Sequence, residues 1–183
     1  MIGVLALQGD VREHIALLES LGAEAFPAKT LDDLAKAKAL VIPGGESTTI
    51  SKLAVNFGLM DSLREFVSNK PVLGTCAGLI LLSESAVGAL GDQQLIGGLD
   101  AKVERNAYGG QTHSFEALVD FDSGKERVAF IRAPKILDTG SCEVIATLEG
   151  EPVAIKQGKV MGASFHPEIT GATTLHKLFI ESL

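Results

Sequence analysis

Short apolar segments alternate with helical segments through the first half of this chain, and this alternation limits its fold more than any other feature. The apolar runs predict strands, at residues 3–7, 39–42 and 71–74. The segments between them carry apolar side chains at helical spacing and predict helices, at residues 11–21, 47–57 and 60–67. Because strands joined through helices build parallel sheets, we expect an α/β fold with a mostly parallel central sheet flanked by helices.

The second half of the chain changes to shorter, β-rich segments. They predict further strands, at residues 101–103, 114–121, 128–131, 143–148, 152–155 and 160–164. A last helix is expected over residues 173–183. With 183 residues, no repeat and no low-complexity linker, the whole chain 1–183 is expected to form a single domain.

Charge and cysteine content exclude several classes of function. The formal net charge is −7, so we expect no basic surface for nucleic acid. The N-terminal apolar run has no basic leader and is too short for a signal peptide or a membrane span, so it is interpreted as a strand. Two cysteines in a chain of this length do not make a disulfide scaffold, which favours a reducing compartment and a cytoplasmic protein.

Cys76 lies between an expected strand and the helix-like run 79–82, inside the motif Gly74-Thr75-Cys76-Ala77-Gly78. Glycines on both sides permit a tight, strained turn, which is typical of a nucleophile elbow with Cys in place of Ser. The N–H of Ala77 would then face a substrate oxyanion, and the start of the helix would favour the thiolate. The alternative for a lone cysteine among apolar residues is an ordinary core position.

A second motif, Ser164-Phe165-His166-Pro167-Glu168, supplies a base and a group to orient it. In an extended segment residues two apart point the same way, so His166 and Glu168 are expected to project together. Glu168 would bind one imidazole nitrogen, and the other nitrogen would take the proton of Cys76. The alternative is a surface turn. Because both motifs fall where one α/β domain would place a site, we predict a Cys-His-Glu hydrolytic triad.

Residues 43–49, Pro-Gly-Gly-Glu-Ser-Thr-Thr, follow a strand and open a helix, which leaves backbone N–H groups for a negative or polarised oxygen. Ser47 is the expected helix cap. A phosphate loop is disfavoured because the segment lacks Gly-Lys-Ser/Thr and because Glu46 would repel a phosphate. An amino-acid site fits better, with Glu46 paired to an α-ammonium group and Arg105 or Arg132 to an α-carboxylate.

Together these motifs resemble the class I glutamine amidotransferases, and specifically the family of glutaminase subunits of glutamine-dependent pyridoxal 5′-phosphate synthases. The resemblance covers almost the whole chain and rests on six segments, at residues 5–14, 43–49, 74–78, 104–109, 130–134 and 164–168. The elbow and the His-x-Glu motif mark only the superfamily. The first segment, Arg-Asn-x-x-Gly and Ile-Arg-Ala-Pro narrow the resemblance to this family.

This resemblance implies a three-layer, flavodoxin-like fold and hydrolysis of L-glutamine to glutamate and ammonia, which passes to a partner synthase subunit. Cys76 would form a thioester, His166 would protonate the departing ammonia, and Glu168 would hold His166. The resemblance also implies oxyanion contacts, at Gly44, Gly45 and Ala77. It implies glutamine-binding positions, at Gly44, Gly45, Glu46, Arg105, Ile131 and Arg132. No cofactor is expected in this chain.

Several histidines and a cysteine fall outside these roles. The family pattern Gly-Arg-Gln-x-Asp-Ser-Phe has Gly110 in place of Arg and His113 in place of Asp here. We interpret His113 as a loop residue because it has no carboxylate two residues away. His14 and His176 are interpreted as helix-face residues and Cys142 as structural. Because these residues have no metal-ligand spacing, no metal is expected.

Two alternatives stay open from the sequence. One is the amidotransferase subunit of another pathway, such as imidazole glycerol phosphate or anthranilate synthesis, and the Arg-Asn and Ile-Arg-Ala-Pro segments argue against it. The other is a non-catalytic cysteine sensor on the same fold, which the presence of a complete Cys-His-Glu set disfavours.

Overall fold

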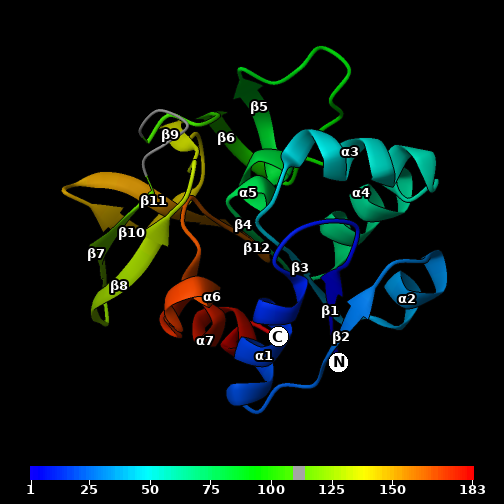
Figure 1. The fold of residues 1–183 in the computed structure, drawn as a ribbon, viewed down its shortest axis with the longest axis horizontal. Coiled ribbons are helices and arrows are strands. Elements are labelled where there is room, and N and C mark those ends of the chain that lie inside the picture. The colour runs from blue at the N-terminus through cyan, green and yellow to red at the C-terminus, as the bar shows by residue number, and fades with distance from the viewer. Residues whose placement is uncertain (109–113) are drawn as a thin grey trace.

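The computed structural model describes residues 1–108 and 114–183, so Gly110 and His113 lie outside the described residues. The chain forms three layers, with a large twisted sheet between two groups of helices (Figure 1). The strands of the large sheet lie in the order β2 (Ala25–Ala28), β1 (Ile2–Leu5), β3 (Ala39–Ile42), β4 (Val72–Thr75), β12 (Val160–Ala163), β11 (Glu151–Gln157), β10 (Glu143–Leu148), β7 (Phe115–Phe121) and β8 (Gly124–Phe130).

This sheet is mixed. From β2 to β12 the neighbouring strands are parallel, and from β12 to β8 they are antiparallel. The parallel half comes from the alternating first half of the chain together with β12, and the antiparallel half comes from the β-rich second half. A separate small sheet contains β5 (Ser83–Val87), β6 (Leu99–Glu104) and β9 (Lys135–Asp138).

Helices cover both faces of the parallel half. One group contains α1 (Val11–Ser20), α6 (Pro167–Thr170) and α7 (Thr174–Glu181), which lie together at the bottom of Figure 1. The other group contains α2 (Leu31–Lys36), α3 (Ser47–Asn56), α4 (Met60–Asn69) and α5 (Ala77–Leu82). Alternate residues of β1 serve the two cores: Val4 packs with Phe179 of α7, whereas Leu5 belongs to the core that contains Ile50 of α3. The predicted α/β fold class with a helix-flanked central sheet is confirmed.

The sequence analysis does not predict β2, α2, β5 or β9. In β2 the reason is Pro27, which lacks an N–H and is tolerated because β2 lies at the edge of the sheet. Helix α2 is short and buries only Leu34, so it has almost no apolar periodicity. Its one local signal is the capping box formed by Thr30 and Asp33.

Among the described residues, no helix is long and apolar enough to cross a membrane. Both cysteines are free and buried. The thiol of Cys142 lies 3.4 Å from Oε1 of Gln157, and this residue packs in the core as the sequence analysis expects.

Candidate active site

The polar motifs meet at one edge of the large sheet, at the carboxyl ends of its parallel strands. The loop after β1 carries Gln8 and Asp10, and the loop after β3 carries the segment 44–46. Cys76 follows β4, and His166 follows β12 with only two residues between. Since these strands are parallel neighbours, their carboxyl ends lie side by side, where α/β sheets bind ligands.

Cys76 occupies the sharp turn between β4 and α5. Its backbone has φ 48° and ψ −98°, a strained conformation for a residue with a side chain. A Cβ on Gly74 would collide with the backbone of Gly78, and a Cβ on Gly78 would collide with the carbonyl oxygen of Ile42. The two glycines therefore allow α5 to begin tightly against β3 and β4. The geometry is that of a nucleophile elbow.

His166 is held through its backbone and its ring. Its N–H donates to the carbonyl of Ala129 in β8 at 2.8 Å, and its Nδ1 lies 2.7 Å from Oε1 of Glu168. The two side chains meet as expected, but the expected extended segment is wrong. Pro167 begins the short helix α6, because a proline at the first helical position has a fixed φ and needs no N–H partner there. His166 itself stays non-helical, as a residue before proline prefers.

Asp10 places a second carboxylate against the same imidazole, and the sequence analysis does not assign it a role. Its Oδ2 lies 3.4 Å from Nδ1 of His166. Burial lowers the pKa of His166, but the contacts with Asp10, Cys76 and Glu168 outweigh burial and raise this pKa to about 12. His166 is therefore positively charged at neutral pH.

The Gly44-Gly45 segment packs directly against the imidazole of His166. A Cβ on Gly44 would overlap the imidazole of His166, so only glycine fits there. Gly45 has φ +151°, a conformation that favours glycine, and the Gly44 carbonyl accepts the N–H of Asp10 at 3.2 Å. The N–H of Glu46 donates to Oε1 of Gln8 at 2.7 Å.

The expected helix cap at Ser47 is wrong. Glu46 is the N-cap of α3, with an extended backbone, and its side chain accepts the N–H of Thr48 at 3.4 Å. Ser47 is already the first helical residue, so its hydroxyl cannot reach the N–H groups that a cap satisfies.

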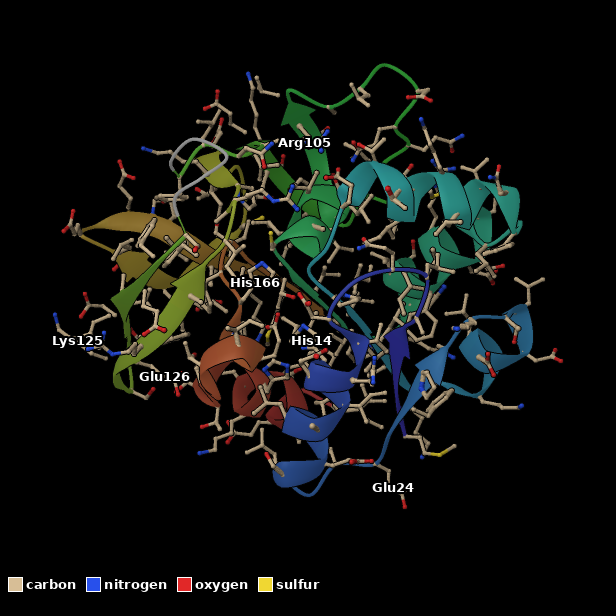
Figure 2. All side chains as sticks on the ribbon, in the orientation of Figure 1. His14, Glu24, Arg105, Lys125, Glu126 and His166 are labelled. Atoms are coloured by element: carbon tan, nitrogen blue, oxygen red, sulfur yellow. The ribbon has the colours of Figure 1, made fainter. Side chains whose placement is uncertain are left out.

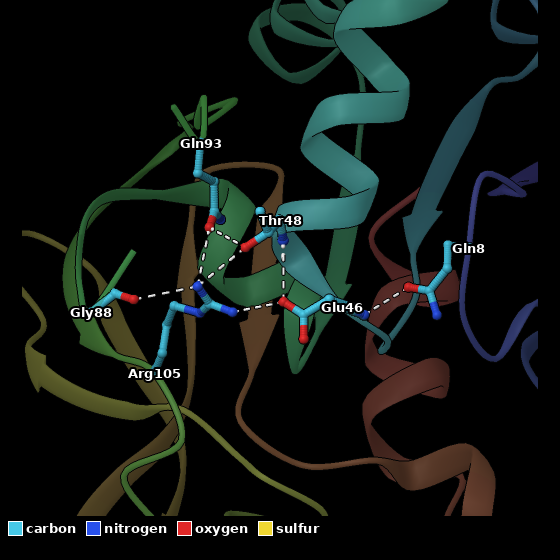
Figure 3. Close-up of polar contacts among 6 residues, drawn as sticks. All are labelled: Gln8, Glu46, Thr48, Gly88, Gln93 and Arg105. Carbon is cyan, nitrogen blue, oxygen red and sulfur yellow. Dashed lines mark hydrogen bonds and ion pairs between the residues drawn. The ribbon is translucent and has the colours of Figure 1, made fainter. Parts of the chain in front are cut away.

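Arg105 and Glu46 form an ion pair at the pocket wall, with Nη2 to Oε1 at 2.7 Å (Figure 3). The other guanidinium nitrogen, Nη1, donates to the hydroxyl of Thr48 at 3.2 Å and to the carbonyl of Gly88 at 3.3 Å. The side chain of Arg105 is 12% exposed, whereas Arg132 is exposed and has φ 46°. The two arginines therefore differ: one guanidinium is already paired and fixed, and the other lies at the exposed rim.

These groups line one cavity of about 260 Å³, the small end of the range for ligand pockets and suited to an amino acid. Of the predicted site residues, it is lined by Gly45, Glu46, Cys76, Arg105, Ile131, Arg132 and His166. The remaining three predicted residues lie behind this wall. Gly44 packs against the imidazole of His166, Ala77 directly follows Cys76, and Glu168 contacts His166 from behind.

The cavity is also lined by residues that the sequence analysis does not single out, namely Gln8, Asp10, Asn106 and Ile169. For Gln8 and Asp10 a signal existed, because both directly follow the first predicted strand, at the edge where such sheets bind ligands. Ile169 is 47% exposed at the cavity rim, and nothing in its local sequence marks it.

Asp10, His166 and Glu168 also have ligand atoms within 4.8 Å of one another, close enough to hold a metal ion. Nδ1 of His166 is already engaged by Glu168 at 2.7 Å. We therefore interpret this cluster as the base and its two carboxylates.

Fold and site together are those of a class I glutamine amidotransferase domain: a cysteine elbow facing a His-Glu pair at the carboxyl edge of a flavodoxin-like sheet. Over residues 4–183 the chain matches the SNO glutamine amidotransferase family, and it belongs to this family. The resemblance inferred from the sequence is thereby confirmed.

Curated relatives of similar length carry one description. The chain is 50% identical to the pyridoxal 5′-phosphate synthase subunit PdxT of Streptomyces griseus, a match that covers 99% of this chain and 94% of the relative. It is 48% identical to the PdxT of Mycolicibacterium vanbaalenii, and this match covers 100% of this chain and 97% of the relative.

Solved structures agree with this assignment. A crystal structure described as a glutamine amidotransferase has a TM-score of 0.92 and 46% identity, and the match covers 99% of this chain and 97% of that one. The structure of PurLQS from Thermotoga maritima, with a TM-score of 0.69 and 15% identity over 98% and 96% of the two chains, shares the fold alone.

Proposed function

We propose that this chain hydrolyses L-glutamine to L-glutamate and ammonia and supplies the ammonia to a synthase subunit that builds pyridoxal 5′-phosphate. The observation that carries the proposal is the placement of Cys76 and His166 in the wall of one cavity of amino-acid size, with Glu168 bound to the imidazole of His166 behind that wall. The curated relatives, about half identical over the full length and described as PdxT subunits, support the pathway.

In this mechanism the Cys76 sulfur attacks the side-chain amide carbon of glutamine. The tetrahedral oxyanion then accepts hydrogen bonds from the backbone N–H groups of Ala77 and the Gly44-Gly45 segment. His166 delivers a proton to the departing nitrogen, so ammonia leaves and a thioester remains. Water, deprotonated by His166, then hydrolyses the thioester and releases glutamate. Glu168 keeps the imidazole oriented and stabilises its positive charge.

Substrate recognition is proposed for the walls of the cavity. Glu46 and Arg105 offer opposite charges for the α-ammonium and α-carboxylate groups, Arg132 offers a second cation, and Ile131 also lines the cavity. The carbonyl of Ile131 lies 3.8 Å from the Cys76 sulfur, so a substrate that contacts it is within reach of the nucleophile.

The reaction is proposed for the cytoplasm, where both free cysteines stay reduced. It requires L-glutamine, a partner synthase subunit and water, with no cofactor, metal or nucleic acid in the scheme. Because the relatives are described as subunits of pyridoxal 5′-phosphate synthase, pyridoxal phosphate synthesis is favoured over the other amidotransferase pathways.

The test is substitution of the nucleophile, with the second cysteine as its matched control. We expect Cys76→Ala to abolish glutamine hydrolysis while the fold stays intact, because the change removes the sulfur and little volume. Cys142→Ala, far from the cavity, should keep wild-type turnover. A glutamine-like alkylating reagent should label wild type and not Cys76→Ala, and glutamine should protect against it. Turnover by Cys76→Ala would overturn the assignment, and oxidant-sensitive labelling without glutamine protection would favour the sensor alternative.

A further inference from the structure

A line of buried polar side chains continues behind the triad, on the side away from the cavity. His14 of α1 and His176 of α7 are both 0% exposed, so the helix-face interpretation of the two histidines misses their main feature. Nδ1 of His14 lies 2.9 Å from Nε2 of His176. On the other side of its ring, Nε2 of His14 lies 3.0 Å from the hydroxyl of Thr75 and 3.4 Å from Oε2 of Glu168. His14 and His166 are both labelled near the middle of Figure 2.

These contacts connect four elements at one point. Thr75 is the last residue of β4, directly before the nucleophile, and Glu168 belongs to α6. Glu168 accepts the imidazole of His166 on Oε1, but its Oε2 is buried and has no hydrogen bond among the described residues. A buried carboxylate oxygen without a donor is costly. The donor candidate is the Nε2 nitrogen of His14, 3.4 Å away, and in a free enzyme such contacts are often long and tighten in the reacting complex.

The geometry selects one arrangement of protons. Burial lowers the pKa of His14 well below its ordinary value, and burial lowers the pKa of His176 to about 4, so both rings are neutral at pH 7. A neutral ring has one N–H. If the proton of His14 were on Nδ1, its Nε2 lone pair would face the carboxylate of Glu168 and be repelled.

With the proton on Nε2, His14 donates toward Oε2 and the Thr75 hydroxyl, and its Nδ1 accepts the Nε2–H of His176. In this arrangement Nδ1 of His176 carries no proton and is an acceptor. That atom is buried and has no hydrogen-bond partner among the described residues. A bare acceptor at this position avoids leaving a buried N–H donor unpaired. The hydrogen bonds in the line therefore point from His176 through His14 to Thr75, and Oε2 of Glu168 lies 3.4 Å from the same His14 nitrogen.

We propose that His14 is a positioning residue of the active site: its Nε2–H, fixed by His176, holds Oε2 of Glu168 so that Oε1 stays ionised and aimed at His166. This inference rests on the proposed triad chemistry. The ionisable groups that face Glu168 are then His166 on one oxygen, His14 on the other and Asp10 across the imidazole, with Cys76 acting through His166. An N–H directed at a carboxylate favours its charged form, so its loss makes Glu168 easier to protonate.

The test compares His14→Leu, which removes the donor, with His14→Gln, whose amide nitrogen reaches the region of Nε2. The readouts are kcat and KM for glutamine in the complex with the synthase subunit, and the pH dependence of Cys76 alkylation by iodoacetamide. For His14→Leu we expect kcat to fall about tenfold or more with KM within about twofold, as for the loss of one charge-assisted hydrogen bond. The acidic limb of the pH profiles of kcat and of Cys76 alkylation should move to higher pH by about one pH unit. His14→Gln should recover most of the wild-type kcat and most of the wild-type pH dependence.

Phe179→Leu is the structural control, because this buried residue of α7 lies in the same core as the helices but outside the polar line. It should lower the melting temperature without moving the pH limb. The proposal is overturned if His14→Leu keeps the wild-type kcat and pH limb, if His14→Gln is impaired as deeply as His14→Leu, or if Phe179→Leu shifts the limb equally.

A second measurement needs no substitution. Long-range proton–nitrogen spectra of the wild-type histidine rings distinguish the two neutral tautomers, and we expect Nε2–H for both His14 and His176. An Nδ1–H tautomer or a charged ring at His14 overturns the proposal. A wild-type chain without glutaminase activity even in the complex with the synthase subunit would count against the proposed function instead, and the alkylation profile and the tautomers would still decide the role of His14.

Discussion

At the level of single residues, the charges of the cavity are already arranged before any ligand enters. Glu46 caps α3 and holds Arg105, whose guanidinium is fixed by four acceptors, so the cationic wall is rigid (Figure 3). A rigid cation loses little entropy when it binds a carboxylate. Glu46 stays available through its second oxygen, since only Oε1 takes part in hydrogen bonds with the described residues.

For this reason Arg105→Gln should raise KM for glutamine by roughly 10- to 150-fold, the equivalent of about 1.5–3 kcal/mol for a charge-assisted contact. The change in kcat should be smaller. Arg64→Gln, an exposed arginine on α4 that pairs with Asp61, is the matched control and should leave KM unchanged. Steady-state kinetics of both variants checks this. An unaltered KM in Arg105→Gln would remove this residue from the substrate site, and the same assay on Arg132→Gln would then test the other guanidinium.

At the level of elements, the junction of β4 and α5 is tightly constrained by its neighbours. The strained backbone of Cys76 persists because its N–H donates to the carbonyl of Ala163 in β12 at 2.7 Å and because α5 is pressed against β3 at Gly78. The elbow is therefore maintained by packing of several elements and not by the turn sequence alone.

We expect Gly78→Ala to destabilise the protein by about 1–3 kcal/mol and to abolish turnover, because the new Cβ meets the Ile42 carbonyl and α5 must move with the nucleophile. Gly91→Ala is the control, since no atom lies within 4 Å of a Cβ built there. Urea unfolding monitored by circular dichroism suits a chain without tryptophan. Equal stability and activity of the two variants would contradict this account of the elbow.

The packing of α1 against α7 predicts a loss of stability in mild acid. His176 has an unfolded-state pKa near 6.5 and a folded-state pKa lowered by burial to about 4, so the unfolded chain binds the proton more readily. Its contribution is present above pH 6.5 and is lost as the pH falls toward 4. Between pH 7 and pH 5 this histidine alone should account for about 2 kcal/mol of lost stability. His176→Gln should show a flatter dependence than wild type in urea titrations at both pH values. Parallel curves for the two proteins would show that the buried ring does not titrate as described.

At the level of the whole molecule, the site opens at the edge of the sheet rather than inside a closed chamber. Ammonia released into water at neutral pH is mostly protonated and loses its nucleophilicity, so a glutaminase that feeds a synthesis benefits from docking its cavity onto the acceptor. The peptide between Gly44 and Gly45 is one point where docking can act. Its carbonyl is held by the N–H of Asp10, so turning its N–H toward the oxyanion requires breaking that bond.

We therefore expect low glutaminase activity in the isolated chain and a rise on addition of the synthase subunit, up to the roughly 10²–10³ that one oxyanion donor contributes to kcat. A kcat titration with the synthase subunit, combined with amide exchange of residues 43–49 in the free and bound states, is the measurement. Full activity of the free chain, with unchanged exchange in this loop, would reject activation by docking and leave the triad chemistry standing.

Much of this arrangement is readable from contiguous residues. A nucleophile elbow needs small residues on both sides of the nucleophile within one turn, so Cys76 and its glycines appear as a short motif. A base and its carboxylate separated by one proline are equally local, and buried parallel strands appear as apolar runs whose polar ends mark the site edge. The sequence by itself therefore determined the fold class, the family, the proposed nucleophile and the position of the site.

Other features were decided only by the tertiary structure, because they depend on which surfaces face each other across long separations. Arg105 and Glu46 are 59 residues apart in the sequence, and His14 and His176 are 162 residues apart, so no local sequence pattern predicts either contact. Helical periodicity places a histidine on a face but does not say whether another polar group lies opposite it. Packing of α1 and α7 against the sheet brings the two rings together behind Glu168, where burial keeps them neutral and Nε2 of His14 lies 3.4 Å from the second carboxylate oxygen.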